Sequence, residues 1–153
     1  MKTLSILLIF ILQLQMCDND EKKPISKNVK VEFRMAKDTK TDNFEEKELD
    51  GTKIYLSPKV EINENDITTV SKTLDHYGSY FIIMLEMNAE GAQKFANLTS
   101  NNVSEKLAIL VNGKIIMAPV IQDKITGGKV QITGNFTSAE VDSLFKTLTE
   151  TQD

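Results

Sequence analysis

The stretch EKLAILVNGKIIMAPVIQDKITGGKVQITGNF, residues 105–136, decides the fold of this chain. Two apolar runs, Leu107–Val111 and Lys114–Ile121, flank the dipeptide Asn112-Gly113. Asparagine and glycine tolerate the positive φ angles that a tight hairpin turn needs. The pattern therefore predicts an antiparallel β-hairpin centred on this dipeptide.

A third strand and a helix are expected after the hairpin. Val130 and Ile132 alternate with polar residues behind a pair of glycines, which indicates a strand. Thr137 and Glu140 have the spacing of a capping box, in which each side chain accepts from the other residue's amide. An apolar stripe follows at helical spacing, made of Val141, Leu144, Phe145 and Leu148. We expect a helix over about 137–149.

The segments before the hairpin indicate more strands and a second helix. Alternating or continuous apolar residues predict strands at about 29–33, 54–56, 67–74 and 80–87. Residues 67–74 also fit a helix capped by Asp66, but their β-branched content favours a strand. Asn88 is a suitable cap for a helix over about 88–99. The charged segment Lys37–Asp50 is expected to be a solvated loop.

This element order predicts the fold class α+β. The alternation of strands and helices is too irregular for a doubly wound parallel sheet. We expect a single mixed or antiparallel sheet with the two main helices, about 88–99 and 137–149, packed on one face.

Composition limits the classes of function. The chain has 153 residues, a net charge of −4 and one cysteine. This length normally forms one domain with one core. Because the basic residues are scattered and the balance is acidic, the sequence lacks the charge pattern of a nucleic-acid binder, and we expect no nucleic-acid partner.

The first 16 residues have the pattern of a signal peptide. Met1-Lys2 is followed by an apolar run, Leu4–Leu12, which is shorter than the roughly 20 residues of a stable membrane span. The run leads into Leu14-Gln15-Met16-Cys17, and a polar stretch follows. We therefore assign residues 1–16 to a signal peptide.

The single cysteine stands where a bacterial lipoprotein carries its lipid. Leu14 and Cys17 match the lipobox that this segment resembles, whereas Met16 departs from it, because Gly, Ala or Ser is usual before the cysteine. We expect Cys17 to be acylated and the membrane to be a partner through that anchor; the alternative is a plain secretory signal with Cys17 a free thiol. Residues 17–28 are then a lipidated, flexible tether, and residues 29–150 are the domain.

No residue pattern indicates catalysis or a cofactor. His76 is the only histidine, and it falls in an expected turn without a Cys, His or repeated acidic residue at ligand spacing. The chain contains no G-x-S-x-G elbow, phosphate-binding glycine loop or H-E-x-x-H motif. We expect no enzyme, no cofactor and no metal.

Several short pieces together resemble a known family. They are Val31-Glu32-Phe33-Arg34, Asp50–Leu56, Glu90-Gly91-Ala92, Asn112-Gly113-Lys114, Ala118–Ile121 and Ile125–Gly128 with Ile132–Phe136. In this order they resemble the first periplasmic domain of SecD, a subunit of the bacterial protein-export machinery, in its head subdomain. The resemblance spans about Val29 to Leu148.

The resemblance implies a periplasm-facing, membrane-anchored module that binds without catalysis. In the family the head is proposed to contact emerging unfolded polypeptide, while acidic transmembrane helices couple proton flow to its movement. These helices have no counterpart among the 153 residues, so the motor is not inferred. Ile115, Met117 and Ile121 are the candidates for a contact surface, because the hairpin is apolar on both faces; the alternative is that both faces are packed. A second hypothesis is a scaffold lipoprotein that binds a membrane complex such as the Sec translocase.

Overall fold

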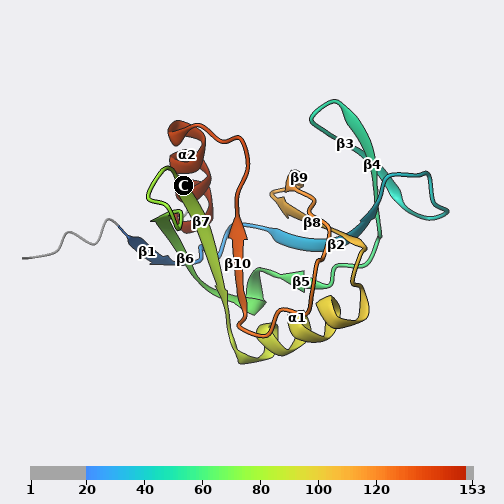
Figure 1. The fold of residues 1–153 in the computed structure, drawn as a ribbon, viewed down its shortest axis with the longest axis horizontal. Helices are drawn as coiled ribbons and strands as arrows, with labels where there is room; N and C mark the ends of the chain where they lie inside the picture. The colour runs from blue at the N-terminus through green and yellow to red at the C-terminus, as the bar shows by residue number, and fades with distance from the viewer. Residues whose placement is uncertain (1–19, 151–153) are drawn as a thin grey trace, which may run out of the picture.

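Residues 20–150 are described by a computed structural model, in which two sheets and two helices surround a shared core (Figure 1). All strand pairs are antiparallel. Cys17 and the expected signal peptide lie outside the described residues. Within residues 20–150, none of the helices has the length and apolar character required to cross a bilayer.

The first sheet has four strands in the order β1-β6-β7-β10. Their bounds are β1 Glu21–Pro24, β6 Ile67–Leu74, β7 Phe81–Met87 and β10 Lys129–Ile132. The central pair, β6 and β7, is a hairpin joined by residues 75–80. The expectation that residues 67–74 form a strand is therefore confirmed.

The second sheet has the order β3-β4-β2-β8-β9, with β5 paired to β2. Its bounds are β2 Val31–Lys37, β3 Glu45–Leu49, β4 Thr52–Leu56, β5 Ile62–Asn63, β8 Lys106–Val111 and β9 Lys114–Met117. The β8–β9 hairpin is the one predicted from the sequence, and its turn residues have φ of 49° at Asn112 and 80° at Gly113. Beyond β9 the chain still follows β8, because Val120 bridges Lys106.

The expectation of a single sheet is wrong. Two separate sheets are present, and β10, which follows the β8–β9 hairpin in the sequence, pairs instead with β7 of the first sheet. Apolar periodicity indicates that a segment is a strand, but partner choice depends on contacts between distant segments. The alternation of Val130 and Ile132 therefore predicted the strand and not its partner.

The two helices begin at the predicted caps. Helix α1 spans Ala89–Asn101, and the side chain of Asn88 accepts from the amide of Gly91. Helix α2 spans Ser138–Thr149, with the capping box of Thr137 and Glu140 formed in both directions. A short 3-10 helix, η1 at Glu64–Asp66, precedes β6 and lies against the start of α1.

The main core lies between the sheets and both helices. Phe33 of β2 meets Phe95 of α1 edge to face, with 6.0 Å between the ring centroids. Phe145 and Leu148 of α2 enter the same cluster. The second face of the β2–β8 sheet has its own smaller cluster, formed by Ala36, Ile54, Leu56, Ala108, Leu110 and Ile115. The second sheet is thus packed on both faces, which explains its nearly continuous apolar runs.

Two segments expected to be irregular are strands. Glu45–Leu49, in the expected loop 37–50, pairs along its whole length with β4. Glu21–Pro24, in the expected tether 17–28, pairs with β6. Both strands lie at the edge of a sheet and are rich in Glu and Lys, which suit an exposed edge but give no apolar signal. A flexible tether can therefore end no later than Asp20.

Candidate functional site

Across residues 20–150, the side chains that most often bind metals or act in catalysis are not grouped as a metal site would require. His76 is exposed in the β6–β7 turn, where its ring centroid lies 5.2 Å from that of Tyr77. Within residues 20–150, no three His, Cys, Asp or Glu side chains are grouped to hold a metal ion. In the same range every buried side-chain nitrogen and oxygen has a hydrogen-bond partner.

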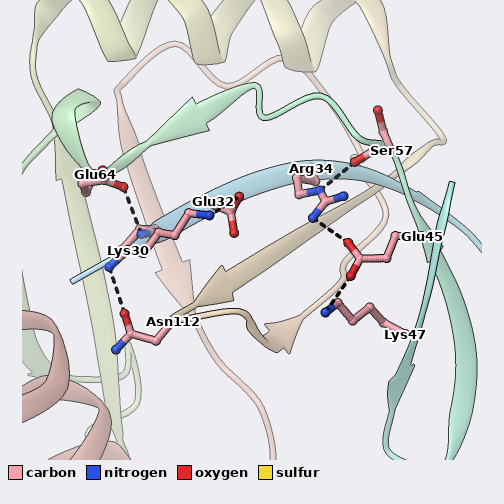
Figure 2. A network of polar contacts seen from close by, with 9 residues as sticks. Lys30, Glu32, Arg34, Glu45, Lys47, Ser57, Glu64 and Asn112 are labelled. Atoms are coloured by element: carbon pink, nitrogen blue, oxygen red, sulfur yellow. Dashed lines mark hydrogen bonds and ion pairs between the residues drawn. The ribbon is translucent and has the colours of Figure 1, made fainter. Parts of the chain in front are cut away.

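A network of charged side chains lies along β2 (Figure 2). Arg34 donates from Nε to the carbonyl of Ser57 at 2.6 Å and from Nη1 to Glu45 at 3.1 Å. Lys47 holds the other oxygen of Glu45 at 2.8 Å and is the main cause of the lowered pKa of that carboxyl, with Arg34 adding to it. Arg34 of β2 is bonded to Glu45 of β3 and to Ser57, which follows β4. The network therefore attaches the β3–β4 hairpin to the second face of the sheet.

The three residues predicted to form a contact surface do not lie together on the surface. Ile115 is buried in the smaller cluster and Ile121 in the main core, on opposite faces of the second sheet. Only Met117 is partly exposed, at the end of β9. Both faces of the hairpin are apolar because one packs against the main core and the other against the smaller cluster.

Met117 does line an apolar groove, which is the best candidate for a binding site. The groove has a volume of about 460 Å³ and lies between the β9 segment and β10. Its floor is formed by core residues Phe33, Phe95, Leu107 and Ile109, and its walls by Met117, Pro119, Val120, Ile125 and Val130. Val120 and Ile125 are each 39% exposed, so the rim presents apolar side chains to solvent. We call this the β9–β10 groove.

A second groove adjoins it along the outer edge of β9. It also has a volume of about 460 Å³ and shares Met117, Pro119 and Thr133 with the β9–β10 groove. Its other lining residues include Leu49 and Asp50 of the β3–β4 turn and the segment Gly134–Phe136. Met117 thus stands between two hollows.

Both strands that flank the β9–β10 groove end their sheets. Within residues 20–150, β9 pairs only with β8, and β10 pairs only with β7. Figure 1 shows β10 between β7 and the β8–β9 hairpin. Unpaired strand edges present rows of free backbone donors and acceptors, to which an extended peptide can add as a further strand.

Charge contributes little to this groove. Asp123 and Lys129 are the ionisable residues of its lining. Lys129 is engaged by Glu86 at 3.4 Å. The groove can therefore offer apolar contact and backbone pairing, and it has no array of charges that would select a particular polar ligand.

Sequence reasoning identified Met117 but missed the exposed rim. Val120 belongs to the apolar run 114–121, where every residue was expected to be part of the hairpin. Ile125 stands alone between Lys124 and Thr126, and a single apolar residue in a polar loop carries no pattern. The pairing of β10 with β7 supplies the β10 residues of the lining, Lys129, Val130 and Gln131.

Comparison with known proteins identifies a family. Residues 37–151 match the family described as "SecDF, P1 head subdomain". The protein translocase subunit SecD of Acidaminococcus fermentans is 34% identical over 105 residues, which are 69% of this chain and 23% of that protein. The SecD of Aquifex aeolicus is 34% identical over 135 residues, or 80% of this chain and 26% of the relative. The chain thus spans about a quarter of the length of these relatives.

Solved structures share the fold. One, described as "Structure and function of a membrane component SecDF that enhances protein export", aligns with a TM-score of 0.60 at 21% identity, covering 83% of this chain and 64% of that one. Another, described as "Crystal structure of SecDF in Super-membrane-facing form", also aligns with a TM-score of 0.60, over 79% of this chain and 19% of that one. At this identity the likeness is one of fold.

Proposed function

Since this chain belongs to the SecDF P1 head subdomain family, we propose that it is an extracytoplasmic, membrane-anchored module that holds unfolded polypeptide during export or envelope maintenance, without catalysis. The observation that carries the proposal is the β9–β10 groove, an apolar hollow lined by Met117 at the end of β9 and by β10, whose outer edge is unpaired within residues 20–150. An extended chain has both an unsatisfied backbone and exposed apolar side chains, and this groove offers partners for each.

The chemistry of the groove suits many sequences. Backbone pairing along β10 does not depend on the side chains of the added strand. Apolar contact with Val120, Ile125 and Met117 requires only some apolar side chains in the bound segment. The module therefore binds segments that are unfolded and partly apolar, and it releases them once they bury those side chains in a core of their own.

Anchoring follows from the segment before the domain. Cys17 carries the lipid, after cleavage of residues 1–16, and the domain faces the periplasm. Several acyl chains on one residue attach a protein firmly, since each buried methylene contributes about 0.8 kcal/mol. The anchor keeps the groove close to the membrane where exported chains emerge.

Site-specific crosslinking in cells tests the proposal. A photo-crosslinking amino acid is placed at Val120, on the rim of the groove, or at Val60, which is outside it. The two positions are matched, because their exposed fractions are 39% and 37%. While export of a secretory precursor is slowed, Val120 is expected to crosslink to that precursor and Val60 is not. Equal yields at the two positions, or none at either, would refute the polypeptide role.

A second candidate function is that of an accessory lipoprotein of a membrane complex. The observation that favours it is that the relatives of this chain are named as subunits of the protein translocase. Purification in mild detergent separates the two functions. A scaffold is recovered with one stoichiometric complex, whereas a polypeptide-binding module is recovered with many substoichiometric chains.

A further inference from the structure

The turn between β6 and β7 carries exposed aromatic and apolar side chains. Leu74 is 36% exposed, Tyr80 53% and Tyr77 85%. We call these three residues the aromatic turn. The carboxylate of Asp75 orders the backbone between them, because it accepts from the amides of Tyr77 at 3.2 Å and Tyr80 at 3.0 Å. Three large side chains are thus held in solvent on an ordered turn.

The chain enters the domain at the same end of the first sheet. β1 runs antiparallel to β6, with Glu21 opposite Lys72 and Pro24 opposite Thr69. Residue numbers fall along β1 as they rise along β6 towards Leu74. The first residue of β1 therefore lies at the end of the sheet that bears the aromatic turn, and Figure 1 shows the start of β1 and this turn on the same side, away from α1.

Side-chain and backbone contacts fix the direction of β1. Lys22 reaches across β6 to Glu86 of β7 at 2.7 Å. The ammonium of Lys72 lies 3.6 Å from the carboxylate of Glu21. After the strand, the amide of Ser26 donates to the carbonyl of Leu148 at 2.8 Å. The first residues of β1 are thus held by contacts to β6 and β7, and the segment just after the strand is held by α2.

The connection from β1 to the expected anchor is short. Cys17 precedes Glu21 by four residues, which span at most about 14 Å when fully extended. A lipid on Cys17, or an uncleaved apolar segment before it, places the bilayer within that distance of the end of β1. The aromatic turn at the same end is then the part of the domain nearest to the membrane.

We infer that the aromatic turn is a membrane-contact surface that inserts Leu74, Tyr77 and Tyr80 into the interfacial region of the anchoring bilayer. The inference rests on the membrane anchoring in the proposed function. Tyrosine suits this place, since its ring is apolar and its hydroxyl stays hydrated among the headgroups. A lipid on Cys17 alone would leave the domain free to rotate about its attachment. A second contact, through the aromatic turn, fixes the orientation of the domain on the membrane.

The charges beside the turn identify the kind of membrane surface. The charged residues at this end of the sheet are of both signs: Asp75 lies in the turn, and Lys72 is paired with Glu21 and with Asp142 of α2. Such a mixture has no net attraction for anionic headgroups. The contact is therefore apolar and interfacial, and it forms on zwitterionic lipid.

Tryptophan fluorescence tests this inference directly, because the chain contains no tryptophan. The full lipidated protein is reconstituted into phosphatidylcholine vesicles with brominated acyl chains, which quench only a tryptophan within the bilayer. The reporter is Tyr77→Trp, and the matched control is Val103→Trp, an exposed position (47%) in the loop after α1. Both positions are in solvent-exposed loops, so neither substitution disturbs the core.

The expected result is a blue-shifted emission for Tyr77→Trp with quenching several-fold stronger than for Val103→Trp. Equal, weak quenching in protein that floats with the vesicles would overturn the inference and leave the anchor intact. A blue shift without quenching would also overturn it, since a second copy of the chain, and not lipid, would then cover the turn. Failure of even the wild-type protein to float would reject anchoring and inference together, whereas the polypeptide role is judged separately by crosslinking at Val120.

Discussion

Gly91 lies directly against the main-chain carbonyl of Asp66: a Cβ atom on Gly91 would be 2.5 Å from that oxygen. The same carbonyl accepts from the amide of Asn88 at 2.9 Å, so the first turn of α1 is fixed to η1 by both a hydrogen bond and close packing. The position therefore admits no side chain without a shift of the backbone.

Replacing Gly91 by alanine is expected to destabilise the domain. The clash is with backbone and cannot be relieved by a rotamer change, so we expect a loss of about 2 kcal/mol in the free energy of unfolding. Alanine would otherwise favour a helical position by up to about 1 kcal/mol. Urea unfolding followed by circular dichroism measures the change. The control is Gly127→Ala, where a Cβ atom meets nothing within 4 Å; equal effects at the two glycines would contradict the account.

Replacing Arg34 by alanine is expected to loosen the β3–β4 hairpin. Its side chain is only 10% exposed and donates to Ser57 and Glu45, so removal leaves the Ser57 carbonyl and one oxygen of Glu45 without the arginine partner. Hydrogen bonds of charged groups contribute about 1.5–3 kcal/mol, and we expect a loss of unfolding free energy in that range. Hydrogen exchange should show faster exchange in β3.

The exposed ion pair of Lys53 and Glu46, at 2.7 Å in the same hairpin, supplies the control. Pairs of this kind contribute little because water screens them. Lys53→Ala should therefore leave stability nearly unchanged. If Lys53→Ala cost as much as Arg34→Ala, burial would not be what gives the Arg34 network its strength.

Low pH is expected to weaken the ion pairs that Glu86 of β7 forms with Lys22 of β1 and Lys129 of β10. Lys22 donates a hydrogen bond to Glu86 and, with Lys129, lowers the pKa of that carboxyl below its ordinary value of 4.5. A carboxyl whose pKa is lower in the folded protein than in the unfolded chain stabilises the fold. This stabilisation is fully present when the pH is above the pKa of the unfolded chain, and it is lost as the pH falls through the pKa of the folded protein. The stability difference between wild type and Glu86→Gln should thus be largest near neutral pH.

Denaturation curves at several pH values measure that difference. It should shrink as the pH falls below 4.5, the ordinary glutamate pKa, and continue to shrink until Glu86 is protonated in the folded protein as well. A difference that stays constant between about pH 7 and about pH 3 would show that the charge of Glu86 does not hold β1 to the sheet.

Lipid attachment at Cys17 predicts a simple labelling result. Cells grown with an alkyne analogue of palmitate should yield a labelled wild-type protein in the membrane fraction. Cys17→Ala should remain unlabelled, because it is the only cysteine of the chain. Equal labelling of the two proteins would remove the lipid anchor from the account.

The sequence predicted the elements whose signals are local. Asn112-Gly113 is a turn that two residues determine, and Asn88 and Thr137 cap helices through amides within three residues. Residues 67–74 were recognised as a strand by their β-branched side chains. In each case the determining atoms lie close together in the chain.

Elements that depend on distant partners could not be predicted in the same way. Edge strands β1 and β3 are stabilised by backbone pairing and exposed ion pairs, so their side chains carry no apolar periodicity. The division into two sheets follows from β10 joining β7, across the 42 positions that separate Lys129 from Met87. The β9–β10 groove exists only because of that pairing, which is why Met117 was identified and its neighbours on the rim were not.

The polypeptide-binding role is tested most directly by titrating the purified full chain with a fluorescently labelled, unfolded secretory precursor and following anisotropy. The wild-type protein is expected to bind saturably, and the double variant Val120→Glu, Ile125→Glu is expected to bind at least about tenfold more weakly, which is a change of about 1.4 kcal/mol. Val60→Glu with Val103→Glu, two exposed positions away from the groove, should bind like wild type. Equal affinity of the two double variants, or no binding by the wild-type protein, would contradict the claim that the β9–β10 groove holds unfolded chains.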